Sequence, residues 1–242
     1  MAAPPVVLVT GAARRIGAAV ARCLHAQGYA IALHYRRPGT ELDALLAELD
    51  ATEAGRVTAL QADLAEPAAC ARLVDAAHAW RGRLDALVNN ASEFGIASLD
   101  DTDAALFDRQ IAVNARAPLL LARAAAPHLR ATQGAIVNLA DVYASHPRAD
   151  AIAYSASKAA LAAITRGLAT ALAPEVRVNA VAPGAILWPE QTPQGNADIL
   201  ARTALARSGT PRDIADAVAW LLRAPFVTGQ VVNVDGGRAL TA

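Results

Sequence analysis

Cysteine is scarce in this sequence, with only Cys23 and Cys70 among 242 residues. Both cysteines lie within segments of helical periodicity, and neither has the spacing of a metal ligand. We therefore interpret them as small buried residues of a protein in a reducing compartment, and we predict no metal site.

The sequence also has no net charge and no long hydrophobic run. The 22 Lys and Arg residues balance 22 Asp and Glu residues, and the sequence pI is about 7.0. Because no basic run would attract a polyanion, we expect no nucleic-acid partner. No uninterrupted apolar stretch reaches the roughly 18 residues that a membrane span needs, and no basic segment precedes the first apolar run. We expect a soluble, cytoplasmic protein with no membrane contact.

The composition that is present, 55% hydrophobic and 18% charged, suits one large α/β domain over residues 1–242. Short β-branched runs alternate with longer segments of helical periodicity. The expected strands are 5–9, 30–35, 56–61, 84–89, 135–139, 176–181 and 230–234. The expected helices are 14–27, 41–52, 67–80, 103–129, 151–172 and 211–222. This alternation predicts a single-domain, Rossmann-like, doubly wound sheet of seven parallel strands with helices on both faces.

One segment, residues 186–209, departs from this alternation. It carries prolines and glycines before a short helical pattern. We expect it to form a lid that covers the substrate beside the carboxyl ends of the strands, where ligands bind in such sheets.

The turn between the first strand and the first helix reads TGAARRIG, residues 10–17. Glycines there permit a tight turn, and the helix N-terminus points backbone N–H groups at a phosphate. An ordinary helix start would also explain the glycines, but the position between a strand and a helix favours dinucleotide binding.

Tyr154 and Lys158 lie one helical turn apart in AIAYSASKAALAAIT, residues 151–165. Side chains at this spacing share a helix face. We predict that the ammonium lowers the pKa of the phenol from about 10 toward working pH, so that the phenol exchanges protons in catalysis. The spacing alone also occurs on solvated helix faces.

Several motifs in order make the chain resemble a short-chain dehydrogenase/reductase over its full length. They are TGAARRIG at 10–17, ADL at 62–64, NNAS at 89–92, Asn114 in the long fourth helix, Tyr154 with Lys158, and PG at 183–184.

The resemblance implies roles for individual residues. Asp63 would contact adenine, Lys158 would hold the nicotinamide ribose, and Asn114 would position a water of the proton relay. A helix cap is the structural alternative for Asp63, and a surface helical amide for Asn114. The expected cofactor-binding residues are Gly11, Arg14, Arg15, Ile16, Gly17, His34, Tyr35, Arg36, Arg37, Asp63, Leu64, Asn90, Ala91, Ser92, Tyr154, Lys158, Pro183 and Gly184.

Three residues depart from the common family pattern. Arg15 stands where a glycine is usual, Asp141 replaces the usual catalytic serine, and Phe94 follows NNASE. An anionic carboxyl group would repel the alkoxide that develops on a ketone, but it can hold or protonate a nitrogen heterocycle. An aromatic ring can stack on a flat ligand. An ion pair for Arg15, a turn cap for Asp141 and an ordinary core position for Phe94 are the alternatives.

With HYRRP at 34–38, these departures resemble the pteridine reductases, which include bacterial dihydrofolate and dihydromonapterin reductases. The resemblance implies a pterin or folate substrate between the nicotinamide and Phe94, reduced at a C=N bond to the tetrahydro form. Pro38 replaces a frequent serine, so one hydroxyl contact to phosphate is lost. The expected substrate contacts are Arg15, Ser92, Phe94, Asp141, Tyr154 and Trp188, and the expected catalytic residues are Asp141, Tyr154, Lys158 and Asn114.

The cofactor is expected to be NADPH, because the second strand ends in HYRR and lacks the acidic residue that would bind a free ribose 2′-hydroxyl. The family resemblance also implies a homotetramer, in which an alanine face of the fifth helix (159, 160, 163 and 169) permits close packing. That face could instead pack on the sheet. Two other functions remain open at this point: a carbonyl reductase, for example one acting on 3-oxoacyl thioesters, and a dinucleotide sensor without turnover.

Overall fold

The seven predicted strands form one parallel sheet in the computed structural model, which describes residues 3–186 and 193–241, with only the backbone described for 193–196. The strands pair in the order β3-β2-β1-β4-β5-β6-β7. Their bounds are β1 (Val6–Val9), β2 (Ala30–Tyr35), β3 (Val57–Gln61), β4 (Ala86–Asn89), β5 (Ala135–Leu139), β6 (Arg177–Pro183) and β7 (Val231–Val234). The predicted doubly wound sheet is confirmed.

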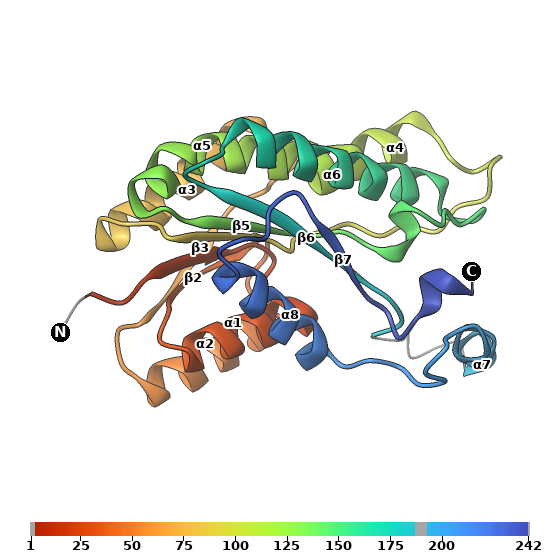
Figure 1. Cartoon of the computed structure of the whole chain (residues 1–242), viewed down its shortest axis with the longest axis horizontal. Helices are drawn as coiled ribbons and strands as arrows, with labels where there is room; N and C mark the ends of the chain where they lie inside the picture. The colour runs from red at the N-terminus through yellow and green to blue at the C-terminus, as the bar shows by residue number, and fades with distance from the viewer. Residues whose placement is uncertain (1–2, 187–192, 242) are drawn as a thin grey trace.

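Helices cover both faces of the sheet (Figure 1). One layer contains α3, α4, α5 and α6, and the opposite layer contains α1, α2 and α8. The bounds of the helices are α1 (Arg15–Ala26), α2 (Thr40–Thr52), α3 (Pro67–Arg81), α4 (Ala104–Ile111), α5 (Ala117–Thr132), α6 (Ile152–Ala171), α7 (Pro193–Ala201) and α8 (Pro211–Arg223). Not one of the described helices is long and apolar enough to cross a membrane.

The first strand shows why this sequence forms a sheet with two covered faces. All four residues of β1 are fully buried. Val6 and Leu8 pack into the core beneath α3 and α5, whereas Val7 and Val9 pack into the core beneath α1 and α8. Successive side chains of a strand point to opposite faces, so a continuous apolar run is stable only between two helical layers.

The long fourth helix that the sequence predicts is interrupted. Asp103 caps α4 by accepting a hydrogen bond from the Leu106 N–H at 2.8 Å. A five-residue π-helical turn, Ala112–Arg116, then separates α4 from α5. Such π turns commonly mark functional sites, because they re-aim side chains within a helix. Asn114 lies in this turn.

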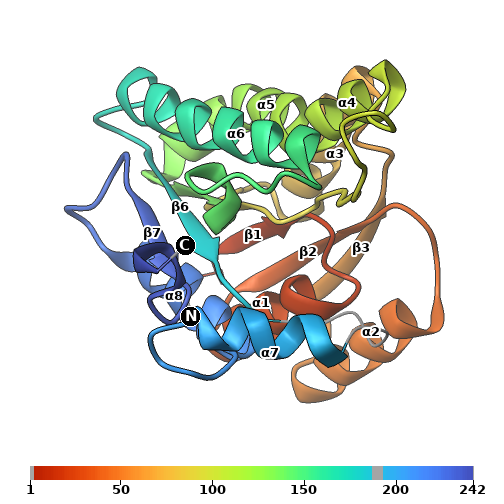
Figure 2. The same cartoon turned by 90° about the vertical axis from the view of Figure 1, so that its right-hand side faces the viewer.

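Strand order reverses beside β1, whose neighbours are β2 and β4. This reversal opens a crevice at the carboxyl edge of the sheet, where ligands bind in doubly wound folds. Figure 2 looks onto that edge, and α7 lies there on the side of α1 and α2. The predicted lid therefore has a described helix at the expected edge, but its covering role remains a prediction. Trp188 lies outside the described residues.

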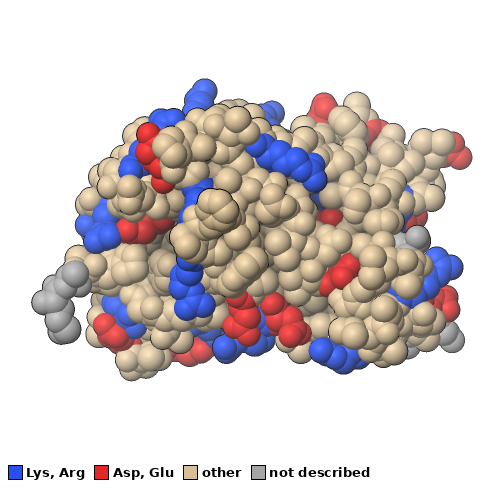
Figure 3. All heavy atoms as spheres, viewed as in Figure 1, with Lys and Arg blue, Asp and Glu red and all other residues tan. Residues whose placement is uncertain are grey.

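The alanine face predicted on α6 is split between surface and core. Ala159 and Ala163 are exposed and Ala160 is half-buried, whereas Ala169 is buried against the sheet. The alternative of packing on the sheet is therefore correct for Ala169. On the face shown in Figure 3, basic and acidic side chains intermingle, in keeping with the zero net charge.

Candidate active site and dinucleotide groove

The turn between β1 and α1 depends on two glycines for a steric reason. Gly11 has a φ of 60°, and a Cβ added there would lie 2.8 Å from the Ala91 Cα. A Cβ on Gly17 would lie 2.3 Å from the Gly11 carbonyl oxygen. The Asn90 Nδ2 donates to the carbonyl oxygens of Thr10 and Gly11 at 2.8 and 2.9 Å. Asn90 thus holds the turn against the end of β4.

Arg15 adopts the left-handed conformation that the usual glycine would favour. Its φ is 55°. This backbone conformation is energetically unfavourable for any residue other than glycine, and residues that adopt it are frequent at functional sites. Its side chain is exposed at the N-terminus of α1. Arg14 is the residue that pairs with an acid, since its Nη1 lies 3.8 Å from Glu41 Oε2. Within residues 3–186 and 193–241 Arg15 makes no ion pair, so the ion-pair alternative lacks support.

His34 was predicted to contact the cofactor, but its side chain is buried. Its ring is 2% exposed and lies beneath the turn. Nδ1 accepts from the Gly11 N–H at 3.1 Å, and Nε2 lies 3.1 Å from the Ala62 carbonyl oxygen, to which it donates. A single neutral tautomer satisfies both bonds, and burial lowers the pKa of this imidazole. His34 therefore supports the turn from below and does not face the groove.

The side chains of several other predicted cofactor residues pack into the protein, so their cofactor contacts stay a prediction. Leu64 is buried in the core beneath α3, and Ile16 and Tyr35 pack against the opposite core. Pro183 is buried at the end of β6, and the Gly184 N–H donates to Val234 O at 3.1 Å. Sequence motifs identify such positions but do not tell backbone contacts from side-chain contacts.

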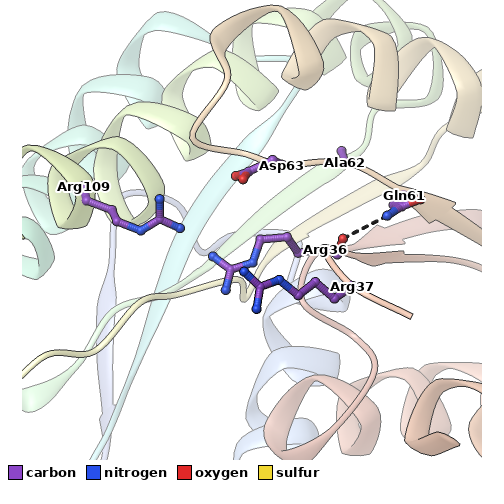
Figure 4. A pocket seen from close by; sticks show the side chains of 6 residues that line it. All are labelled: Arg36, Arg37, Gln61, Ala62, Asp63 and Arg109. Carbon is purple, nitrogen blue, oxygen red and sulfur yellow. Dashed lines mark hydrogen bonds between the residues drawn. The ribbon is translucent and has the colours of Figure 1, made fainter. Parts of the chain in front are cut away.

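Three arginines meet at a cavity of about 450 Å³ at the end of β2. Arg36 and Arg37 extend their guanidinium groups toward Arg109 from α4, as Figure 4 shows. Three guanidinium groups suit a phosphate dianion, so the residues present fit the 2′-phosphate of NADPH. The remaining lining residues are Gln61, Ala62 and Asp63.

Asp63 lines this cavity and also shapes its own turn. Its Oδ1 accepts from the Ala65 N–H at 3.0 Å. This bond closes a local turn and does not cap α3, whose N-cap residue is Glu66, so the helix-cap alternative is wrong, and the adenine contact stays a prediction. Sequence analysis missed Gln61 and Arg109. Gln61 Nε2 donates to the Arg36 carbonyl oxygen at 3.1 Å, and Arg109 reaches the cavity from a distant helix, with no local motif to reveal it.

Asn114 is buried and fixes the loop after β4. Its Oδ1 accepts from the Ser92 hydroxyl at 3.1 Å and the Glu93 N–H at 2.8 Å. Its Nδ2 donates to the Glu93 carbonyl oxygen at 2.8 Å and to Ser157 Oγ at 2.9 Å. The alternative of a surface amide is wrong. Asn114 joins the loop that carries Ser92 to α6.

Half-buried Asp141 and buried Tyr154 form a hydrogen-bonded pair. The phenol donates to Asp141 Oδ2 at 2.9 Å, while Oδ1 accepts from the Tyr143 N–H at 3.0 Å. Asp141 therefore caps a short 3₁₀ helix, Val142–Ala144, and also contacts the phenol. Burial raises the pKa of the Asp141 carboxyl, although the Tyr143 N–H and nearby Lys158 act against this shift.

The predicted effect of Lys158 on Tyr154 is wrong. Burial, followed by the charge of Asp141, raises the pKa of the phenol well above its ordinary value. The Lys158 Nζ donates to the Leu139 carbonyl oxygen at 2.8 Å and lies 5.6 Å from the centre of the Tyr154 ring. Burial also lowers the pKa of Lys158 to about 8, with Asp141 opposing. The ammonium is thus too far from the phenol, and itself too desolvated, to dominate it.

Lys158 carries a signal that the sequence analysis overlooked. It is the only lysine in the chain, and the other 21 basic residues counted among Lys and Arg are arginines. Every other Lys or Arg position of the sequence is arginine, and lysine occurs at this buried position alone. Lysine shifts its pKa readily on burial, whereas arginine stays charged.

Phe94 lies at the surface beside the buried pair. Its side chain is 52% exposed, and its ring meets the Tyr154 ring edge-on, with centroids 4.7 Å apart and an interplanar angle of 88°. The core alternative is therefore wrong. An exposed aromatic ring can hold a flat heterocycle by stacking, and the neighbouring carboxyl–phenol pair can exchange a proton with that heterocycle.

Known proteins resemble this chain over nearly its full length. A protein-family model described as "Enoyl-(Acyl carrier protein) reductase" matches residues 11–239. Pteridine reductase 1 of Leishmania tarentolae is 34% identical, with 98% of this chain and 97% of that protein covered. The granaticin polyketide synthase putative ketoacyl reductase 2 of Streptomyces violaceoruber is 39% identical, with 98% and 96% covered. A solved structure of a blue fluorescent protein from a metagenomic library, in complex with NADPH, superposes with a TM-score of 0.91 at 36% identity, covering 97% of this chain and 98% of that one.

Proposed function

Because the chain belongs to the short-chain dehydrogenase/reductase family, we propose that it reduces a pterin or folate from the dihydro to the tetrahydro form. The protein is an NADPH-dependent oxidoreductase, as its family and the NADPH-bound relative indicate. The proposed substrate class rests on one observation, the hydrogen bond of 2.9 Å between Tyr154 and Asp141.

The Asp141 carboxyl group favours a nitrogen heterocycle over a ketone. Ketone reduction builds negative charge on oxygen, and Asp141 would repel that charge in every molecule in which its carboxyl group is ionised. A ring nitrogen that is protonated before the hydride arrives becomes a neutral amine, so its reduction tolerates either form of the carboxyl group. The carboxyl–phenol pair therefore suits a C=N bond better than a C=O bond.

Proton delivery depends on both members of the pair. Bound NADPH supplies the hydride for the substrate carbon. Tyr154 can release its proton to the neighbouring nitrogen only with difficulty while Asp141 is ionised, because a phenolate would then form beside a carboxylate. The raised pKa of Asp141 lets this carboxyl group carry a proton and replace the one that Tyr154 gives up.

The rest of the site supplies orientation. Exposed Phe94 supports the substrate ring by stacking, and Asn114 holds Ser92 and its loop in place. Arg15, exposed in the strained turn at the start of α1, is the proposed polar contact to the substrate. The lid and Trp188 remain proposed substrate neighbours.

A carbonyl reductase is the second candidate, and the ketoacyl reductase relative favours it. In that case Asp141 would be a tolerated replacement of the family serine. A dinucleotide sensor is less well supported, because it would not need Asn114, Tyr154 and Lys158 together.

The test is NADPH oxidation, followed by absorbance, with three groups of substrates: dihydropterins with dihydrofolate, 3-oxoacyl thioesters, and simple ketones. We expect turnover with the first group, and we expect Tyr154→Phe to remove it. Turnover with thioesters or ketones and none with pterins would establish the second candidate.

We also propose that the protein is a cytoplasmic homotetramer, as its family suggests. Exposed Ala159 and Ala163 on α6 allow close helix approach between subunits. Sedimentation at micromolar concentration should show a species near four times 24.9 kDa; a monomer would contradict this state without bearing on the activity.

A further inference from the structure

Glu93 joins the two sides of the cofactor groove through its carboxylate. Arg109 Nε donates to Oε2 at 2.5 Å, and Arg109 Nη2 donates to Oε1 at 2.6 Å. The Nη1 of Arg36 also donates to Oε1. Arg36 follows β2, Glu93 follows β4, and Arg109 lies on α4. One carboxylate therefore bridges three segments at the mouth of the phosphate cavity.

Glu93 is held in place and carries a charge. Asn114 binds both its backbone N–H and its carbonyl oxygen, each at 2.8 Å. Its side chain is 23% exposed. Burial raises the pKa of the Glu93 carboxyl, but hydrogen bonds from Arg109 and Arg36 outweigh burial and hold the pKa below its ordinary value. A fixed anion thus lies against the cations that line the cavity.

The same guanidinium groups face both Glu93 and the cavity. Arg36 and Arg109 line the cavity together with Arg37, yet both hydrogen-bond Glu93. Arg109 binds the carboxylate in a bidentate manner, whereas Arg36 donates a single hydrogen bond to it. A phosphate dianion that enters the cavity will therefore take Arg36 from Glu93, while Arg109 continues to neutralise the carboxylate.

We propose that Glu93 is a specificity-determining residue that competes with the 2′-phosphate of the cofactor for Arg36. The carboxylate keeps Arg36 occupied until the phosphate arrives, and it weakens phosphate binding by the free energy of the Arg36–Glu93 contact. This role concerns the cofactor alone and does not depend on the identity of the substrate.

The test is calorimetric titration with adenosine 2′,5′-bisphosphate and with AMP, which lacks the 2′-phosphate. Glu93→Gln removes the competing charge, so we expect the Kd of the bisphosphate to fall about twofold to fivefold, which corresponds to the strength of an exposed ion pair. The Kd of AMP should stay the same. In an Arg36→Ala background, the increase in bisphosphate affinity caused by Glu93→Gln should be lost or strongly reduced, because the guanidinium for which Glu93 and the phosphate compete is absent.

A matched control separates this effect from the loss of any ion pair. Glu48 accepts three hydrogen bonds from Arg22 on the far side of α1, at 2.7 to 3.0 Å, and Glu48→Gln should leave both affinities unchanged. Glu93→Ala, which keeps the backbone bonds to Asn114, serves as a second variant if Glu93→Gln fails to fold. An unchanged or raised Kd for the bisphosphate, or an equal shift for AMP, would overturn the proposal in favour of a structural clamp.

Discussion

The two ends of the cofactor groove place charged groups in opposite surroundings. At the phosphate end, the side chains of Arg36 and Arg109 are 40% and 48% exposed and share the carboxylate of Glu93. At the proton end, Lys158 and Tyr154 are 3% and 6% exposed, and half-buried Asp141 accepts a hydrogen bond from Tyr154.

This difference decides which physical effect controls each end. Exposed ion pairs are hydrated and screened by salt, so their contacts exchange readily and each is worth about 1 kcal/mol or less. Buried ionisable groups lose hydration, and this loss shifts their pKa values. The phosphate end thus selects a ligand by charge, and the proton end adjusts protonation by burial.

The largest effect should come from Asp141→Ser, which removes the carboxyl group at the buried end. We expect pterin reduction to fall by about 10² to 10⁴, the loss typical of a positioned proton-transfer group, with NADPH affinity nearly unchanged. Steady-state rates and NADPH titration measure the two quantities.

A matched control for this variant is Asp50→Ser. Asp50 also accepts a backbone N–H, from Gly55 at 2.8 Å, but is exposed in the last turn of α2. It should leave the rate unaffected. Full pterin activity in Asp141→Ser would show that the carboxyl group does no proton work.

The next effect concerns Lys158, whose buried ammonium should titrate near pH 8, against an ordinary 10.5. This shift is roughly a hundredfold or more in proton affinity. Because the chain has one lysine, protein labelled with nitrogen-15 lysine gives a single side-chain signal, and its pH titration reads this pKa directly. A midpoint above 10 would mean that the buried end is more hydrated than its geometry indicates.

Cofactor preference tests the exposed end. A charge-assisted hydrogen bond contributes roughly 1.5 to 3 kcal/mol, so kcat/KM for NADPH should exceed that for NADH by about tenfold to a hundredfold. Arg37→Ala should reduce this ratio. Added salt should also reduce it, because salt screens the attraction between the arginines and the phosphate. Equal kcat/KM values for the two cofactors would remove the phosphate role of Arg36 and Arg37.

The smallest effect should follow Phe94→Ala, because the ring contributes stacking only. Stacking is worth about 0.5 to 1.5 kcal/mol beyond area burial, so the KM for a dihydropterin should rise roughly twofold to tenfold while the KM for NADPH changes little. A folded variant with an unchanged pterin KM would exclude Phe94 from the substrate site.

Short-range patterns account for what the sequence could predict. Strand and helix alternation led to the seven-stranded sheet, and the motif around Gly11 and Gly17 led to the turn. Fixed spacing placed Tyr154 and Lys158 on one helix. Each of these signals lies within a few residues of chain, where backbone geometry decides the outcome.

What the sequence could not supply depends on tertiary contacts. Arg109 and Glu93 meet Arg36 only because the fold brings α4 and the segments after β2 and β4 together, and the π turn at Asn114 has no strong local pattern. The sign of the Tyr154 shift was mispredicted because burial and Asp141 outweigh a lysine whose Nζ lies 5.6 Å from the ring centre. His34 lies in β2, two residues before Arg36, and its side chain is buried beneath the turn after β1.

Burial raises the pKa of the Asp141 carboxyl above its ordinary value, and the proposed proton delivery depends on this shift. Its most direct test is the titration of the Asp141 carboxyl carbon in protein labelled with carbon-13 aspartate, assigned by comparison with Asp141→Asn. We expect a midpoint clearly above the ordinary carboxyl value of about 4, with pterin reduction present below that midpoint and declining as pH rises through it. A midpoint at or below the ordinary value would contradict the account, because Asp141 would then be a fixed anion with no proton to give.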